Sequence, residues 1–309
     1  MYIPEEEVRS LLTWEALFPA IRQALIDFSA GPRANHIVDQ PPRSILRSNH
    51  TTGPNNGWFA AMPVIYQDVM AVKTVTFFPG NANLGLHTHM AIIELLSRTT
   101  GQPLAIMDGR LITEMRTAAV SAVALDALVP RGARSLGILG SGVQARSHLA
   151  AFRLLRPDIA DVRIWSRTPA HVEAFAAGTQ IRATTIEEAA SADVVLVATA
   201  SPTPVLMGRW LKPDALVISV GAVGPTVREL DDETLHTSYI VAESRHAAER
   251  ESGDIVLSNS SVQAEIGEIL SDPASHPFPK KGRVLFKSVG MAIEDLVAAK
   301  LVWQARQSR

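Results

Sequence analysis

The residues with the clearest chemical pattern are glycines that follow a short, mostly apolar run. Residues 135–139 form that run, and Gly140, Gly142 and Ala145 complete the pattern Gly-x-Gly-x-x-Ala. Gly140 allows a tight reversal of the chain, and Gly142 lets the backbone approach a pyrophosphate without a Cβ in the way. Free N–H groups at the start of the next helix then face the phosphates. The pattern therefore predicts a dinucleotide-binding turn.

The segments after the turn have the order that a nucleotide-binding sheet requires. Leu149, Phe152 and Leu155 recur at helical spacing, and a strand-like run follows at residues 162–165. Further β-like runs span residues 194–197, 216–220 and 239–242. Strands that alternate with helices are typical of an α/β fold with a parallel, doubly wound sheet. A glycine turn alone also occurs for structural reasons, so this context favours the cofactor interpretation.

The elements before the turn predict a separate α+β unit. Residues 1 to about 30 carry an apolar stripe at helical spacing, so we expect a helix there. A helix over residues 117–128 leads into the nucleotide-binding half, and an amphipathic helix over residues 290–303 closes the chain and packs on the first unit. Strands are expected at residues 57–63, 71–77, 90–96 and 104–107, the last two forming a hairpin through residues 99–101.

Composition limits the classes of function. With 309 residues, 47% of them hydrophobic, and a net charge of −2, the chain is expected to form two domains. Lys and Arg are scattered, which excludes the basic patch of a nucleic-acid binder. There is no cysteine, so disulfides and thiolate catalysis are excluded. The acidic start and the lack of a ~20-residue apolar run predict neither export nor a membrane span, and we expect a cytoplasmic protein.

The end of the second strand of the nucleotide-binding half indicates which cofactor binds. An NAD-binding fold usually places an acidic side chain there for the ribose 2′-OH, whereas this chain has Ser166, Arg167 and Thr168. A guanidinium and two hydroxyls can hold a phosphate. The sequence therefore favours NADP(H), with NAD(H) as the alternative. Arg167 could also be an exposed arginine at a strand end with no role in cofactor binding.

Several blocks along the chain resemble the ornithine cyclodeaminase/mu-crystallin family. They are residues 40–43 (QPPR), 73–80 (KTVTFFPG), 99–109 (TTGQPLAIMDG), 113–119 (TEMRTAA), the glycine turn and 286–295 (FKSVGMAIED). The resemblance implies a Rossmann domain, residues 117–290, inserted in a substrate-binding and dimerisation domain of residues 1–116 plus 291–309. It also implies a homodimer, and a substrate that is a small imino or amino acid.

Three cations lie in blocks that match the family's substrate-binding positions. Arg43 and Arg116 can each make a two-pronged contact with a carboxylate, and Lys73 can add a charge or a proton. Taken alone, each of these residues is more typical of a surface cation or a structural ion pair. Taken together, they predict a site for the substrate carboxylate, with Lys73 as the proton source. Thr117, at an expected helix start, would contact cofactor phosphate or cap the helix. The cofactor-binding residues are expected to be Gly140, Ser141, Gly142, Val143, Gln144, Ser166, Arg167, Thr168, Thr117, Thr199 and Val220.

Two histidines and a segment near the C-terminus complete the candidate site. His87 and His89 would share one face of a strand, but they lack a third ligand, so we expect no metal. His89 falls close to a block that lines the family's pocket, and it is taken as substrate-binding. Ser288, Gly290 and Asp295 match a segment near the nicotinamide in relatives, and Ser288 and Gly290 are taken as substrate-binding. The alternative for this segment is the plain start of a helix.

One departure from the family pattern separates its activities. Cyclodeaminases of this kind carry an Asp two residues before Pro225 and a Lys two residues after it, whereas this chain has Val223 and Val227. Cyclisation with loss of ammonia needs a positioned base, and valine moves no proton. We therefore predict an NAD(P)H-dependent reductase of cyclic α-imino acids, such as Δ1-pyrroline-2-carboxylate or Δ1-piperideine-2-carboxylate. The alternatives are a cyclodeaminase or alanine-type dehydrogenase, and a non-catalytic NADP-binding protein.

Overall fold

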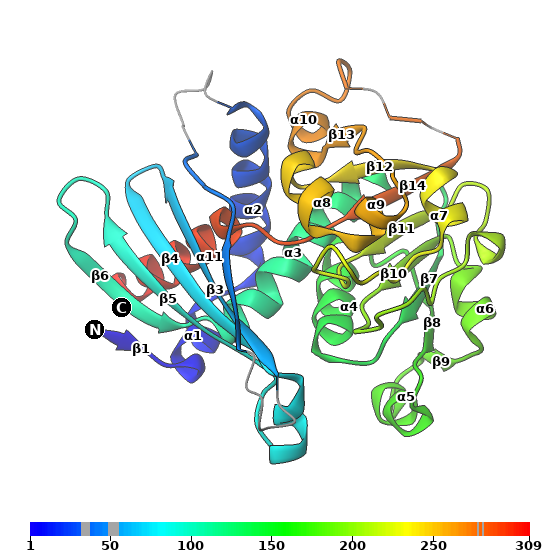
Figure 1. Ribbon diagram of the computed structural model, residues 1–309, viewed down its shortest axis with the longest axis horizontal. Coiled ribbons are helices and arrows are strands. Elements are labelled where there is room, and N and C mark those ends of the chain that lie inside the picture. Colours follow the sequence, from blue (N-terminus) through cyan, green and yellow to red (C-terminus); the bar gives the residue numbers. More distant parts are fainter. Residues whose placement is uncertain (32–37, 49–55, 277, 280) are drawn as a thin grey trace. The chain divides into compact units, whose positions relative to one another are not determined.

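The computed structural model describes residues 1–31, 38–48, 56–276, 278–279 and 281–309. They form two compact units (Figure 1): unit 1 comprises Met1–Arg116 and Met291–Arg309, and unit 2 comprises Thr117–Gly290. Helix α3 (Arg110–Leu128) contains the residues at which the chain passes from unit 1 to unit 2. Among the described residues, no helix combines the length and apolarity needed to cross a membrane.

Unit 1 is built on a six-stranded sheet with the order β1-β6-β5-β4-β3-β2. Neighbouring strands are antiparallel except for the parallel pair β1 and β6. The expected hairpin is confirmed, because the Ser97 N–H donates to the Gln102 carbonyl between β5 and β6, and Gly101 takes a positive φ of 72° in the turn. The strands are β1 (Tyr2–Ile3), β2 (Ser44–Ser48), β3 (Gly57–Tyr66), β4 (Val69–Phe77), β5 (His89–Ser97) and β6 (Pro103–Asp108).

Helices cover one face of this sheet. Helix α11 (Ala292–Gln307) packs against α2 (Trp14–Ser29) and against strands β3, β4 and β5 (Figure 1). The expected amphipathic pattern of this last helix is wrong for its first half, since every side chain from Ala292 to Ala299 is buried. The sheet lies against one side of α11 and helices α1 (Glu5–Leu11) and α2 pack on it as well, which leaves little of that half exposed.

Two other helix predictions need correction. The expected continuous helix over residues 1–30 is broken, because Leu12 is extended and Thr13 caps α2 by accepting from the Ala16 N–H. The helix expected to begin at Thr117 begins instead at Arg110, whose N–H donates to the Asp108 carboxylate at 2.9 Å. Thr117 is therefore inside a helix, where it caps nothing.

Unit 2 contains the predicted parallel, doubly wound sheet. Its eight strands have the order β13-β12-β14-β11-β10-β7-β8-β9, and every neighbouring pair is parallel. The strands are β7 (Ser135–Leu139), β8 (Asp161–Trp165), β9 (Arg182–Ala183), β10 (Val194–Val197), β11 (Leu216–Ser219), β12 (Ser238–Ala242), β13 (Ala264–Glu265) and β14 (Arg283–Lys287). The helices after α3 are α4 (Val143–Leu155), α5 (Pro169–Ala176), α6 (Ile186–Ala190), α7 (Asp232–His236), α8 (Arg245–Glu251), α9 (Gly253–Leu257) and α10 (Ile266–Ser271).

The order of the strands creates a switch point beside β7. From β7 the chain proceeds to β8 on one side and later returns to β10 on the other. In open α/β sheets, ligands bind outside the carboxyl ends of the strands at such a point. The apolar runs of β10 and β11 are fully buried and form the core that fixes these strand ends.

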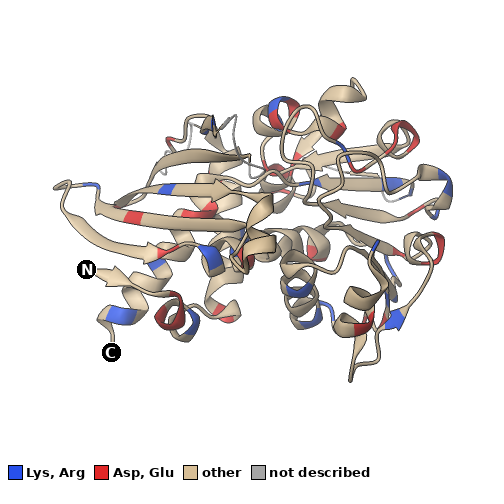
Figure 2. Ribbon diagram, turned by 60° about the horizontal axis from the view of Figure 1, so that its bottom comes forward, with Lys and Arg blue, Asp and Glu red and all other residues tan. Residues whose placement is uncertain are grey.

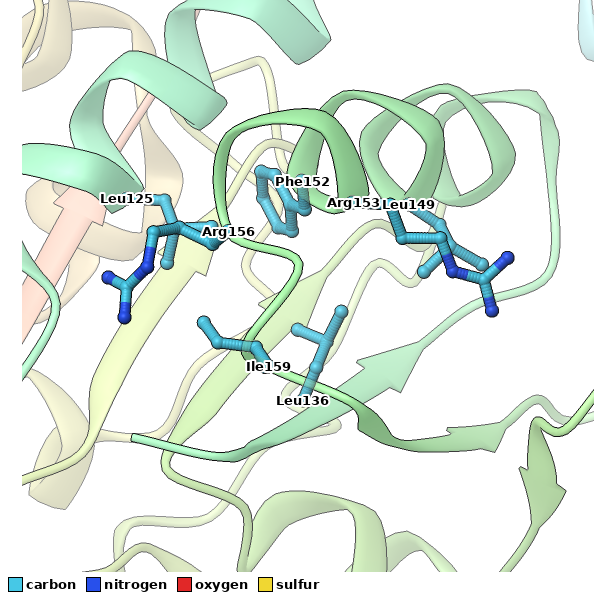
Figure 3. Close-up of a pocket in the computed structure, with 7 residues that line it drawn as sticks. All are labelled: Leu125, Leu136, Leu149, Phe152, Arg153, Arg156 and Ile159. Carbon is cyan, nitrogen blue, oxygen red and sulfur yellow. The ribbon is translucent and has the colours of Figure 1, made fainter. Parts of the chain in front are cut away.

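A small apolar space lies under α4 (Figure 3). Leu125, Leu136, Leu149, Phe152 and Ile159 line it, and the charged ends of Arg153 and Arg156 point away from it. A space without a polar group facing inward cannot hold a carboxylate, so we treat it as a packing gap of the unit 2 core.

Candidate active site

Unit 1 buries an ionic cluster under helix α11. Lys73 lies on β4, on the face of the sheet that this helix covers, and is only 3% exposed. Its Nζ lies 2.6 Å from Oδ2 of Asp295, which is in the first turn of α11. Arg116 reaches the same carboxylate, since its Nε donates to Asp295 Oδ1 at 3.1 Å and its Nη1 donates to Glu294 at 2.5 Å. One carboxylate therefore joins the lysine and the arginine.

Burial of this cluster changes the proton affinity of the lysine. Removal from water lowers the pKa of Lys73 to about 8, and the positive charges of Arg116 and Arg43 add to that effect, while Asp295 opposes it. Burial alone would raise the pKa of Asp295, but Arg116 and Lys73 beside it hold that pKa below its usual value. At neutral pH the cluster thus contains a protonated lysine that can release its proton at modest cost.

The other two predicted substrate residues belong to the same neighbourhood. Arg43 is half-buried and close enough to Lys73 for its charge to act on the lysine. His89 opens β5 on the same face as Lys73, and burial together with Lys73 and Arg116 lowers the pKa of His89 to about 4. His89 is therefore neutral near pH 7 and can serve as a hydrogen-bonding group. His87 precedes the strand, so the expectation that both histidines share one strand face is wrong.

The predicted substrate-binding cations therefore lie close together in unit 1. The charges of Lys73 and Arg116 are, however, already balanced by the carboxylates of Asp295 and Glu294. Sequence reasoning placed Asp295 near the nicotinamide and left Glu294 unmentioned. Both belong to α11, and the only available signal was a pair of adjacent acids in a helix rich in apolar residues. Figure 2 shows basic and acidic positions interspersed along the ribbon, so burial rather than number distinguishes this cluster.

The glycine turn of unit 2 has the geometry of a phosphate cradle. Gly140 has a φ of +118°, and a Cβ there would overlap the Ala198 carbonyl. Gly142 precedes the first turn of α4, and a Cβ there would meet nothing within 4 Å, so open space lies next to this backbone. No side chain caps the helix, which leaves its first N–H groups facing that space, with Val143 and Gln144 opening the helix. These features fit the pyrophosphate of a dinucleotide.

Polar side chains extend the cradle at the end of β8. Ser141 Oγ donates to Ser166 Oγ at 3.0 Å, which joins the glycine turn to the end of β8. Arg167 and Thr168 follow Ser166 and are exposed. No carboxylate occupies residues 166–168, where a 2′-hydroxyl-binding acid is usual.

Thr199 and Val220 follow β10 and β11 at the carboxyl edge of the sheet. The Thr199 N–H donates to Glu229 Oε1 at 2.9 Å, and its hydroxyl donates to the same oxygen. The Val220 N–H donates to the Val197 carbonyl, so this residue continues the ladder between the two strands. Thr117, in contrast, is buried inside α3, and the helix-start role expected for it is wrong.

The segment that leads out of β14 is fixed by a buried carboxylate. The N–H groups of Val289 and Gly290 donate to Glu243 Oε1, and the Ser288 N–H donates to the Ser219 carbonyl at 3.0 Å. Ser288 and Gly290 are buried, and Gly290 takes a φ of +81°. The backbone of these two residues is thus held in one conformation.

A second buried ionic group lies behind the strand ends of unit 2, and sequence reasoning missed it. Lys287 Nζ donates to Asp254 Oδ2 at 2.8 Å, to the Gly221 carbonyl at 2.6 Å and to Ser219 Oγ at 3.0 Å. Glu229 and Asp254 are, like Lys287, completely buried. Within the described part of the chain, no group of three or more His, Asp or Glu side chains is arranged to hold a metal ion.

The whole sequence matches one protein family. The profile described as "Ornithine cyclodeaminase/mu-crystallin family" matches residues 1–309. The ketimine reductase mu-crystallin of Mus musculus is 40% identical over 99% of this chain and 97% of its own length. The Delta(1)-pyrroline-2-carboxylate reductase of Bacillus cereus (strain ATCC 10987 / NRS 248) is 29% identical over 100% and 97%.

Solved structures agree with this match. The structure of Thermococcus litoralis Delta(1)-pyrroline-2-carboxylate reductase in complex with NADH and L-proline superposes with a TM-score of 0.92 at 31% identity, covering 100% of this chain and 98% of that one. An archaeal alanine dehydrogenase dimer with bound NAD also gives 0.92, at 28% identity and with 100% and 96% covered.

Proposed function

The chain belongs to the ornithine cyclodeaminase/mu-crystallin family, and from this premise we propose that it reduces cyclic α-imino acids to the corresponding α-amino acids, with NADPH as the preferred hydride source. It is an oxidoreductase of the NAD(P)H-dependent class that acts on C=N bonds. The proposed substrates are Δ1-pyrroline-2-carboxylate and Δ1-piperideine-2-carboxylate, which would give proline and pipecolate.

The observation that carries this proposal is the buried Lys73. Reduction of a C=N bond adds a hydride to the carbon and a proton to the nitrogen. When bound, the reduced nicotinamide supplies the hydride. A lysine whose pKa is lowered by burial to about 8 is protonated at pH 7 and still acidic enough to give up that proton. Lys73 therefore has the properties of a proton donor to the imine nitrogen.

The arginines of unit 1 would bind the substrate carboxylate. Arg116 makes charge-assisted bonds to Glu294 and Asp295, and its planar guanidinium can share its donors with an incoming carboxylate. Arg43 is only half-buried, so it can reorient toward a ligand. Neutral His89 adds a hydrogen-bonding group without adding charge.

The loop after β11 favours reduction over cyclodeamination. Val223 is 41% exposed, and its backbone bridges to Ser252, so the loop presents an apolar side chain where a cyclodeaminase has an acid. Ring closure with loss of ammonia needs a base for several proton transfers. An imine that already contains its C=N bond needs only one proton, and Lys73 can provide it.

Preference for NADPH is proposed from the end of β8. Exposed Arg167 next to Ser166 and Thr168 can bind a 2′-phosphate, and no acid at these positions would repel it. The cradle formed by Gly140 and Gly142 would hold the pyrophosphate of either dinucleotide.

We also propose a homodimer formed through unit 1. The face of the sheet turned away from α11 exposes large apolar side chains on strands β3, β5 and β6, namely Phe59, Met90, Ile92 and Ile106. An exposed apolar sheet face of this kind suits a second copy of the chain. Sedimentation velocity of the wild type and of Ile92→Glu tests this, with a monomer expected for the variant.

The test of the activity is NADPH oxidation at 340 nm with each cyclic imine, alongside an ammonia assay with ornithine and NAD. Imine-dependent oxidation that Lys73→Met abolishes, and that Lys300→Gln retains, supports the proposal. Lys300 is the matched control because it forms a surface pair with Asp68 in the same unit. Ammonia and proline from ornithine would show a cyclodeaminase instead, and nucleotide binding without turnover would show a non-catalytic binder.

A further inference from the structure

Glu229 is a buried carboxylate beneath two loops of the nucleotide-binding edge. Its Oε1 accepts from both the N–H and the hydroxyl of Thr199, which follows β10. Its Oε2 lies against Gly221, which follows β11, so closely that a Cβ on Gly221 would overlap the carboxylate. One side chain therefore contacts both loops.

The charges around Glu229 are balanced without it. Lys287 and Asp254 form an ion pair at 2.8 Å, and Asp254 Oδ1 also accepts from the N–H groups of Glu229 and Leu230, at 2.7 and 3.0 Å. Among charged groups, Lys287 and Asp254 have the largest effects on the Glu229 carboxylate. An ionised Glu229 therefore leaves this buried region with one net negative charge.

The second carboxylate oxygen of Glu229 differs from the first in its hydrogen bonding. Glu229 Oε2 is buried, and among the described residues it has no hydrogen-bond partner. A buried charge that lacks full hydrogen bonding is costly. Burial accordingly raises the pKa of Glu229 to about 7, although Lys287 and Thr199 favour the ionised form. Glu229 is thus a group whose charge a nearby ligand can change near neutral pH.

The position of Glu229 relates it to one end of the dinucleotide. A dinucleotide spans the crevice at the switch point, and its 2′-OH end lies by the second strand of the fold, which is β8 in this chain. Thr199 and Gly221 follow β10 and β11, on the other side of β7. The nicotinamide end therefore belongs with the loops that Glu229 holds.

The two oxidation states of the nicotinamide ring differ by one positive charge. The oxidised ring is cationic and the reduced ring is neutral, so a buried carboxylate interacts with them differently. We propose that Glu229 discriminates between the oxidation states of the cofactor, its ionised form favouring the oxidised nicotinamide through charge and through the position of Thr199. This inference rests on the proposed binding of a nicotinamide cofactor to unit 2.

The test is calorimetric titration of the whole protein with NAD⁺ and with NADH between pH 6 and 8.5. These ligands are preferable to NADP because a 2′-phosphate itself titrates near pH 6. The affinity for NAD⁺ should increase with pH, by up to about tenfold for each unit by which the cationic ring lowers the Glu229 pKa. The affinity for NADH should stay flat. Binding of NAD⁺ near pH 6.5 should also release about half a proton, for a one-unit change.

Variants separate this role from a structural one. Glu229→Gln keeps the shape and one acceptor oxygen but cannot ionise, so its affinity for NAD⁺ should be independent of pH and equal to that of the wild type at low pH. Glu187→Gln, at an exposed position of the same unit, should behave like the wild type. Thr199→Val removes one donor to the carboxylate and should shift the pH midpoint upward, which provides a second test if Glu229→Gln does not fold.

Each outcome is decisive. A pH-independent affinity of the wild type for NAD⁺, or the same pH dependence in Glu229→Gln, would overturn the inference while leaving the proposed cofactor intact. Failure of NAD⁺, NADH and NADPH alike to bind at any pH would overturn the proposed function as well.

Discussion

Replacement of Asp295 by Asn tests the proton-donor role of Lys73 most directly. Asp295 Oδ2 lies 2.6 Å from the Lys73 Nζ and opposes the fall of the Lys73 pKa that burial causes. An opposite charge at this distance typically shifts a pKa by about 1 to 3 units, so its loss should lower the Lys73 pKa from about 8 to roughly 6. At pH 7 the protonated fraction then falls from about 90% to about 10%.

The assay is the pH dependence of imine reduction between pH 5 and 9. In the proposed mechanism the high-pH limb of kcat reports loss of the proton from Lys73. This limb should move about two units toward acid in Asp295→Asn, and kcat at pH 7 should fall about tenfold. KM should not rise, because the variant removes a carboxylate that competes with the substrate for Arg116. Ratios of variant to wild type at each pH cancel the titration of the imine itself.

Controls distinguish this shift from general damage. Loss of one partner in a buried ion pair costs about 3 kcal/mol or more, so Asp295→Asn should also lower Tm. Asp68→Asn makes the same chemical change at the surface pair with Lys300 and should cost less than about 1 kcal/mol, with no change in the pH profile. A high-pH limb that stays in place in Asp295→Asn would refute the assignment of Lys73 as the acid.

Three further predictions concern the arginines and the buried glutamate. Arg116→Ala should lower kcat/KM by about 2 to 4 kcal/mol in transition-state free energy, because a buried carboxylate contact is lost; an unchanged value would remove Arg116 from the site. Arg167→Ala should weaken NADPH much more than NADH in fluorescence titrations, and equal losses would show that it does not bind the 2′-phosphate. The Glu229 pKa is raised from 4.5 to about 7, so the folded state holds the extra proton. Relative to Glu229→Gln, the wild type should therefore lose up to about 3 kcal/mol of unfolding free energy as pH rises from about 4.5 to 7, as measured by urea titrations.

The sequence predicted the parts of the fold that depend on local pattern. The glycine turn, the apolar runs of β10 and β11 and the hairpin of β5 and β6 are each encoded within a few residues, and the structure contains them all. Helix α3 was misplaced at its start because its first turns carry Arg110, Thr113 and Glu114 among the apolar residues, which weakens the periodic signal. The actual signal was Asp108, which accepts from the Arg110 N–H.

Charged groups of the candidate site were harder to predict, because they depend on contacts between distant segments. Lys73 and Asp295 lie near opposite ends of the chain, and no spacing rule joins them. Lys287, Asp254 and Glu229 are fully buried, although Lys, Asp and Glu are almost never fully buried unless paired. The residue type alone therefore predicts that these side chains are exposed, and only the fold shows the partners that allow them to be buried.

Burial shifts the pKa values of Lys73 and Glu229 in opposite directions. In unit 1 burial favours the neutral form of Lys73, whose pKa is about 8, and in unit 2 it favours the neutral form of Glu229, whose pKa is about 7. Reduction of an imine consumes one proton and leaves a cationic nicotinamide. Lys73 suits the first requirement because it carries a proton that it can release, and Glu229 suits the second because it can become negative when the ring becomes positive. The charge changes of the proposed reaction would account for both costly burials. Stability alone would account for neither, since a well-packed apolar side chain in either place would stabilise the fold equally well or better.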